Sequence, residues 1–172
     1  LNESEGTVVK EEVDVERMLV SGVALDKKAA RISVMGLKDE PGIAFRLFQI
    51  LAKNNINVDI ILQSIGRENT KDISFTVNEE EADEVVALIE ENKSRITAKE
   101  VNCNKSVAKV SIVGAGMMSN PGVAAKMFEA LYSRGININM ISTSEIRITV
   151  LVNLEDGERA MNAIHEAFGL SE

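Results

Sequence analysis

The chain has 172 residues, of which 45% are hydrophobic, and its aromatic residues are limited to five Phe and one Tyr. This composition is typical of compact layers of helices on a sheet with an aliphatic core, in one domain or two small ones. The formal net charge of -8 argues against nucleic acids and anionic membranes as partners, because binding to phosphates depends mainly on Lys and Arg.

Cysteine usage and hydropathy bear on the compartment. Cys103 is the only cysteine, which excludes an internal disulfide and a metal site built from several cysteines. No apolar run approaches the roughly 20 residues of a membrane span, and no signal-like segment opens the sequence. We therefore expect a cytoplasmic protein.

The N-terminal segment is strongly acidic. Residues 1–16 hold six acidic side chains against one lysine, so we expect a solvated linker or leader there. The sequence begins at Leu1 rather than at an initiator Met, which suggests a fragment or processed piece of a longer protein. A strand-like run follows at residues 18–24.

The next segments belong to an internal repeat. Residues 30–36 and residues 108–114 both alternate apolar and polar side chains as strands do, and each run ends at a glycine. A short loop and a Pro-Gly pair follow, at Pro41 and at Pro121, where proline fits the first turn of a helix. The side chains expected to face the core from these two helices are Ile43, Leu47, Phe48, Ile50 and Leu51, and Val123, Met127, Phe128 and Leu131.

The repeat continues in both copies with the same order of elements. The helices should stop at Asn54-Asn55 and at Gly135, residue types that favour helix ends. The first copy also has a last strand, at residues 95–101, whereas the second copy ends without one. The remaining elements expected are strands at 56–63 and 136–143, strands at 73–77 and 146–152, and helices at 80–91 and 155–168.

The missing strand determines the predicted architecture. The run at residues 18–24 should close the second sheet, because an unpaired edge strand promotes aggregation. The predicted fold is α+β, with two ferredoxin-like βαββαβ modules, each an antiparallel sheet with helices on one face. Module 1 would cover residues 30–105 and be inserted into module 2, made of residues 17–29 and 106–172.

No catalytic or metal motif is present. The run from Gly114 to Gly116 lacks the third glycine of a dinucleotide fingerprint. His165 is the only histidine, and it has no Ser or Cys close by in sequence to activate. The sequence has no Walker loop, zinc-ligand spacing or nucleophile elbow. It therefore nominates no catalytic residue, metal or cofactor.

Two strand–loop–helix junctions remain, at residues 38–42 and 118–122. A helix N-terminus has free N–H groups and a partial positive charge, so each junction could receive the carboxylate of a free amino acid. The alternative is that their polar residues only cap helices and form turns. The side chains expected beside the junctions are Asn57, Asp59 and Gln63 in one copy and Asn137 and Asn139 in the other.

Several motifs around these junctions match a known family. They are Val20-Ser-Gly-Val-Ala24, Lys38-Asp-Glu-Pro-Gly42, Asn57-Val-Asp59 with Gln63, Asp72-Ile-Ser-Phe-Thr76, Ser119-Asn-Pro-Gly122 and Ile141-Ser-Thr-Ser-Glu-Ile146. Over residues 16–170 the chain resembles the regulatory tail of aspartate kinase, a pair of ACT domains. The resemblance implies a non-catalytic part of a cytoplasmic enzyme that phosphorylates aspartate. ATP would serve only the kinase domain, which this chain lacks.

The resemblance also implies an allosteric role and a set of partners. Lysine, threonine or both would bind between two copies of the chain and inhibit the kinase domain or catalytic subunit by feedback. A threonine-type site is implied at Asp39, Gly42, Ala44, Asn57 and Gln63, with Asn137 and Ile138 opposite. A lysine-type site is implied around Asp59, Val123, Met127, Ser144 and Glu145. Ala124 and Asn120 depart from the family, so the preferred effector stays open.

Three other functions share this topology. A free-standing amino-acid-sensing ACT regulator is the main alternative, and a transcriptional version would need a DNA-binding helix pair that the sequence does not show. An acylphosphatase-like enzyme would need an Arg and an Asn placed to hold phosphate, and Arg31 is only a strand residue here. An RNA-binding version lacks stacking aromatics and basic charge.

Overall fold

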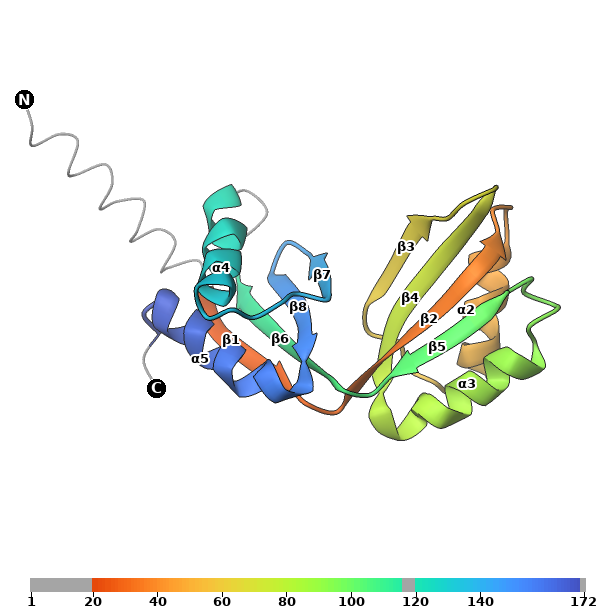
Figure 1. Cartoon of the computed structure of the whole chain (residues 1–172), viewed down its shortest axis with the longest axis horizontal. Coiled ribbons are helices and arrows are strands. Elements are labelled where there is room, and N and C mark those ends of the chain that lie inside the picture. The colour runs from red at the N-terminus through yellow and green to blue at the C-terminus, as the bar shows by residue number, and fades with distance from the viewer. Residues whose placement is uncertain (1–19, 116–119, 171–172) are drawn as a thin grey trace, which may run out of the picture. The chain divides into compact units, whose positions relative to one another are not determined.

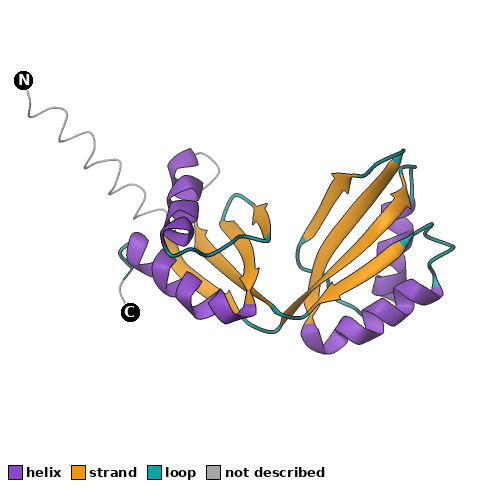
Figure 2. Cartoon of the chain, viewed as in Figure 1, coloured by secondary structure: helices purple, strands orange, loops and turns teal. Residues whose placement is uncertain are grey.

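The computed structural model describes residues 20–115 and 120–170 and divides into two compact units. The inserted unit comprises residues 28–107. The split unit comprises the described residues on either side of the insertion, 20–27, 108–115 and 120–170. In each unit two helices cover one face of a sheet (Figures 1 and 2). The predicted α+β class is therefore confirmed.

The inserted unit contains a four-stranded sheet in the order β3-β4-β2-β5, with every neighbouring pair antiparallel. The central strand β2 pairs with β4 on one side and with β5 on the other. The elements are β2 (Ala29–Lys38), α2 (Ile43–Lys53), β3 (Ile61–Ile65), β4 (Thr70–Asn78), the 3-10 turn η1 (Glu79–Glu81), α3 (Ala82–Glu91) and β5 (Glu100–Asn104).

The split unit has a four-stranded sheet in the order β1-β6-β8-β7. The strand expected at residues 18–24 to close this sheet is β1, which pairs antiparallel with β6 so that Val23 lies opposite Ile112. The elements are β1 (Val20–Asp26), β6 (Val107–Gly114), α4 (Pro121–Ser133), β7 (Met140–Thr143), β8 (Arg147–Asn153), the 3-10 turn η3 (Leu154–Asp156) and α5 (Gly157–Ala167).

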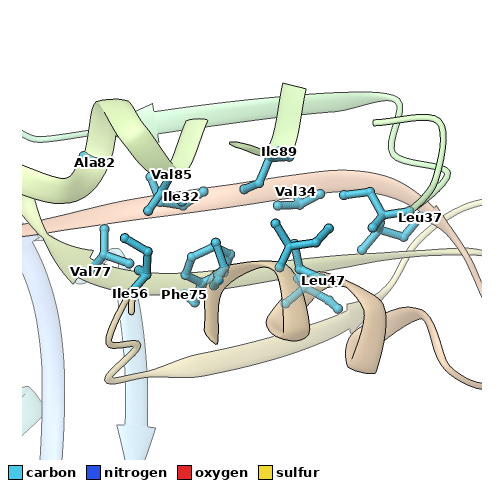
Figure 3. Packing of buried hydrophobic residues seen from close by; sticks show 14 of the residues in the cluster. Ile32, Val34, Leu37, Leu47, Ile56, Phe75, Val77, Ala82, Val85 and Ile89 are labelled. Atoms are coloured by element: carbon cyan, nitrogen blue, oxygen red, sulfur yellow. The ribbon is translucent and has the colours of Figure 1, made fainter. Parts of the chain in front are cut away.

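Each unit has its own aliphatic core between sheet and helices. In the inserted unit, Ile32 and Val34 of β2 and Phe75 of β4 pack against Leu47 of α2 and Val85 of α3 (Figure 3). Burial of each such side chain stabilises the fold by about 1.5–3 kcal/mol. The helix faces predicted from the apolar spacing are confirmed. The corresponding buried set of the split unit includes Ile112, Val123, Met127, Leu131, Val150 and Ile164.

The two prolines of the repeat begin their helices differently. Pro121 occupies the first turn of α4, as expected. Pro41 lies outside α2, and the expectation for it is wrong. The N-cap of α2 is Gly42, whose φ of 94° is left-handed. A glycine adopts this conformation without steric cost, so the chain turns at Gly42 and the helix starts one residue later.

The ends of α2 and α4 agree with the sequence. Asn55 and Gly135 follow the two helices with φ of 58° and 66°. The next residues then close the helix ends, because Ile56 N–H donates to Leu51 O and Ile136 N–H donates to Leu131 O, both at 3.0 Å. This is the bonding pattern of a Schellman motif.

These closures explain why two strands begin later than expected. The segments predicted as strands at 56–63 and 136–143 start with residues that end the helices. The first segment then pairs with Thr76, through bonds from Asp59 N–H to Thr76 O and from Thr76 N–H to Ile60 O. In the second segment, Asn139 N–H donates to Leu151 O. Regular strand structure begins only at Ile61 and at Met140.

The strand predicted at residues 95–101 is wrong in position. Asn92 caps the end of α3 by donating from Nδ2 to Leu88 O at 2.8 Å, and Ile96 N–H donates to Asn92 O at 3.1 Å. Ile96 is fully buried, so this apolar residue anchors a turn rather than a strand. The strand β5 starts at Glu100.

Two sequence expectations lie outside the described residues. They are the acidic linker at residues 1–16 and residues 118–119 of the second junction. Within the ranges 20–115 and 120–170, no helix is both long enough and apolar enough to cross a membrane.

Close packing at Gly157 gives a test of the split unit. An added Cβ there would lie 2.9 Å from Ala108 Cβ and 3.2 Å from Leu25 Cδ1. We expect Gly157→Ala to cost about 1–3 kcal/mol in overpacking, partly offset by up to about 1 kcal/mol of helix propensity. Thermal unfolding measures the net loss. Gly22→Ala is the control, because nothing lies within 4 Å of its added Cβ; equal stability of the two variants would contradict this account.

Candidate functional site

The first candidate junction joins β2 to α2 in the inserted unit. Gly42 and Pro41 are exposed, and Ala44 is half-buried on the first turn of α2. The helix has no side-chain cap and no acidic residue in its first turn. The first N–H groups of a helix have no partner within it and carry partial positive charge. This turn therefore offers hydrogen-bond donors suited to a carboxylate.

The loop before α2 is tied to the turn between β3 and β4. Asp39 N–H donates to Asn69 O at 2.9 Å, and Lys71 Nζ lies 3.7 Å from Asp39 Oδ1. Glu40 forms a second ion pair with Arg46 at 3.5 Å. Partly exposed pairs of this kind contribute about 0–1 kcal/mol each. They fix the position of the loop more than they stabilise the fold.

Asn57, Asp59 and Gln63 lie on the exposed edge segment of the inserted unit. Asp59 N–H donates to Thr76 O at 3.1 Å, so the backbone of this segment follows β4. Gln63 is in β3, opposite Ile73 of β4. The three polar side chains therefore lie on one edge of the inserted unit, and all three are exposed.

Amide side chains form a short chain at the equivalent position of the split unit. Asn137 Nδ2 donates to Asn139 Oδ1 at 3.5 Å, and Asn139 Nδ2 donates to Asn153 Oδ1 at 3.0 Å. Asn137 is exposed, whereas Ile138 packs partly against the core. In this chain the Asn137 side chain uses one N–H donor, and an amide also has a second N–H and an acceptor oxygen.

The residues expected to form the lysine-type site differ in how exposed they are. Ser144 and Glu145 are exposed in the turn between β7 and β8, where Ser144 N–H donates to Arg147 O at 2.8 Å. Val123 and Met127 are 0% exposed, inside the core of the split unit. Their side chains belong to the core between α4 and the sheet, so they are not on the surface of the unit.

An apolar edge is the feature that the sequence interpretation missed. All five residues of β3 are exposed, and Ile61 and Ile65 are 51% and 94% exposed. In the split unit, Ile141 of β7 and Ile146 in the turn after β7 are also exposed. By contrast, the opposite edge strand β5 exposes polar residues such as Asn102. The only available signal was an apolar residue at both ends of the Ile61–Ile65 run, and it becomes informative only once β3 is known to be an edge.

Comparison with known proteins agrees with this geometry. A family model described as an ACT domain matches residues 32–92 and 110–168. The regulatory subunit of aspartate kinase from Thermus thermophilus, in its ligand-free form, is 44% identical with a TM-score of 0.82, over 87% of this chain and 99% of that one. This chain belongs to the ACT-domain family of aspartate kinase regulatory chains.

Two further relatives agree with the assignment. A structure of aspartokinase alpha and beta subunits contains a chain that is 43% identical with a TM-score of 0.81, over 88% of this chain and 99% of that one. The aspartokinase of Bacillus sp. (strain MGA3) is 42% identical over 172 residues, which are 99% of this chain and 42% of that protein. The chain spans about two fifths of the curated relatives it matches. The predicted tandem ACT architecture is confirmed.

The described residues of the ACT units hold no group of three or more His, Cys, Asp or Glu side chains that could bind a metal ion. Cys103 lies on the edge strand β5 and is exposed. Partial burial raises the pKa of its thiol, the nearby Lys105 ammonium lowers it, and the Asp83 carboxylate raises it again, so that the net shift is upward.

Cys103 should therefore be a slow nucleophile. A raised pKa keeps the thiol protonated near neutral pH, and the thiolate is the reactive form. We expect iodoacetamide to alkylate Cys103 more slowly at pH 8 than it alkylates an unstructured cysteine peptide. The rate should keep rising at pH values where the peptide has levelled off. Alkylation of the folded protein as fast as the peptide would contradict the raised pKa.

Proposed function

We propose that this regulatory ACT region binds lysine, threonine or both where two copies of the chain meet, and that it thereby inhibits an aspartate kinase by feedback. The observation that carries the proposal is the edge strand β3. Its exposed apolar side chains lie on the same segment as the polar residues Asn57, Asp59 and Gln63. A partner on this edge would enclose those polar groups.

The chemistry of an amino acid fits the groups on this edge. Its carboxylate would accept hydrogen bonds from the first N–H groups of α2. Its ammonium group would pair with a carboxylate such as Asp39 or Asp59 through a charge-assisted hydrogen bond. The amides of Asn57 and Gln63 can both donate and accept, which suits a hydroxyl or an ammonium on the effector side chain.

The edge itself supports a second copy as the partner. An edge strand presents unpaired N–H and C=O groups, and an exposed apolar edge is a template for pairing with another chain. Homo-oligomers with twofold symmetry are the commonest arrangement. We infer a homodimer in which Asn137 and Ile138 from the second copy complete the site.

Coupling to a kinase domain or catalytic subunit follows from such a bridging site. A ligand shifts an equilibrium only by its difference in affinity for the two states. An effector held by two copies would favour the assembled arrangement, with a coupling of about 1–3 kcal/mol typical of allosteric proteins. The N-terminal linker at residues 1–16 would transmit the change, because it continues directly into the module that includes β1.

Calorimetry tests effector binding directly. We expect the full chain to release or absorb heat with lysine, threonine or both. Gln63→Ala should weaken binding about 3–10-fold, the usual effect of losing one hydrogen bond. Asn102→Ala on the opposite edge is the matched control and should bind like the original chain. If neither lysine nor threonine gave a heat of binding, the proposal that they are the ligands would be refuted.

Sedimentation tests the interface. Ile65→Glu should shift the chain toward monomer and weaken effector binding, because a charge would be buried between copies. The isolated unit should tolerate the change, since residue 65 lies opposite Lys71. Tyr132→Glu, at a residue that is 83% exposed on α4, is the control and should leave the assembly intact. An unchanged dimer in Ile65→Glu would argue against this edge.

A further inference from the structure

Two contacts and a left-handed backbone conformation fix Gly36 near the end of β2. Its N–H donates to Asp72 Oδ1 of β4 at 2.9 Å. Its φ is 72°, in the left-handed region. On its other side lies the side chain of Lys99, which an added Cβ would approach to 2.7 Å. No larger residue fits this position without displacing a neighbour.

These contacts surround a β-bulge. The pairing of β2 with β4 shifts between Val34 and Leu37, because Val34 lies opposite Ile73 and Leu37 lies opposite Lys71. One extra residue in β2 reverses the alternation of side chains. Ile32 and Val34 face the core before the bulge, and Leu37 faces it afterward. The bulge therefore decides which residues of the following loop point outward.

The loop that follows the bulge is the candidate effector loop, residues 38–42. Two backbone N–H groups tie this loop to its neighbours. Asp39 N–H donates to Asn69 O, and Lys38 N–H donates to Thr97 Oγ1 at 3.1 Å. These anchors hold the first two residues of the loop, whereas Asp72 holds Gly36, two residues before the loop begins. A carboxylate that accepts from a backbone N–H forms a stronger hydrogen bond than a neutral acceptor does.

We propose that Asp72 is a positioning residue for effector binding: by holding Gly36 N–H, it sets the bulge and with it the orientation of residues 38–42. This inference rests on the proposed function of that loop. Asp72 itself need not touch the effector, because its carboxylate is bonded to Gly36, before the loop begins.

The split unit lacks this anchor in its described residues. Gly114 ends β6 as Gly36 nears the end of β2, but its N–H donates to the backbone O of Ile146 at 2.9 Å. Arg147 occupies the position of the repeat that corresponds to Asp72, since Arg147-Ile-Thr149 aligns with Asp72-Ile-Ser74. The two copies are therefore not equivalent, and replacement of Asp72 should affect only the junction of the inserted unit.

Substitutions at Asp72 separate positioning from charge and from general stability. Asp72→Asn keeps an oxygen acceptor for Gly36 N–H and should bind lysine or threonine within about twofold of the original chain. Asp72→Ala removes the acceptor and should weaken binding about tenfold. Both affinities are measured by calorimetry on the full chain, with thermal unfolding recorded for each variant.

Asn78→Ala is the matched control, because Asn78 Oδ1 accepts from Glu80 N–H at 3.0 Å at the far end of the same strand. It should lower stability without changing effector affinity. Equal affinities for Asp72→Ala and Asn78→Ala would overturn the proposal.

If Asp72→Ala does not fold, Asp72→Glu takes its place: it keeps the charge but moves the carboxylate, and it should bind more weakly than Asp72→Asn. Binding of Asp72→Glu equal to that of Asp72→Asn would overturn the proposal as well. A failure of the original chain to bind either amino acid would instead refute the proposed function.

Discussion

The split unit depends on backbone pairing between two strands that the insertion separates in sequence. β1 supplies one edge of the sheet, and β6 can pair with it only after the chain has passed through the whole inserted unit. Without β1, the N–H and C=O groups along one side of β6 would be unpaired, and an exposed central strand of this kind is a site of aggregation. The close approach of Gly157 to Leu25 and Ala108 depends on the same pairing.

The two units divide stability and recognition between different faces. The buried side of each sheet carries the aliphatic core, in which residues such as Phe75 and Met127 are fully enclosed. The polar groups proposed for binding lie at strand edges and helix starts, where backbone donors are not used by the fold. Backbone turns with left-handed glycines, at Gly36 and Gly42, connect the two regions. Substitutions at the edge can therefore change which ligand is bound without altering the core.

Much of the fold could be predicted because its signals are local. The apolar stripes of α2 and α4, which include Leu47 and Met127, can be recognised from the helical period alone. The ends of these helices can be recognised because Asn55 and Gly135 are residue types that adopt the left-handed conformation. Strand limits were less predictable, because Ile56 and Ile96 look like strand residues but take part in helix closures and turns. The polar side chains of the candidate site were visible as a motif. The apolar edge at Ile65 was not, because its exposure depends on the order of strands in the sheet.

The interrupted sheet also constrains the order of events during synthesis. β1 leaves the ribosome before the inserted unit, yet its partner β6 follows only after residues 28–107 have been made. At about 5–20 residues per second, that interval is on the order of several seconds, far longer than a hairpin needs to form. The inserted unit contains all of its own strands and can fold within the interval. β1 must wait unpaired during this interval, so a strand made before the whole inserted unit reaches its final structure only after that unit is complete.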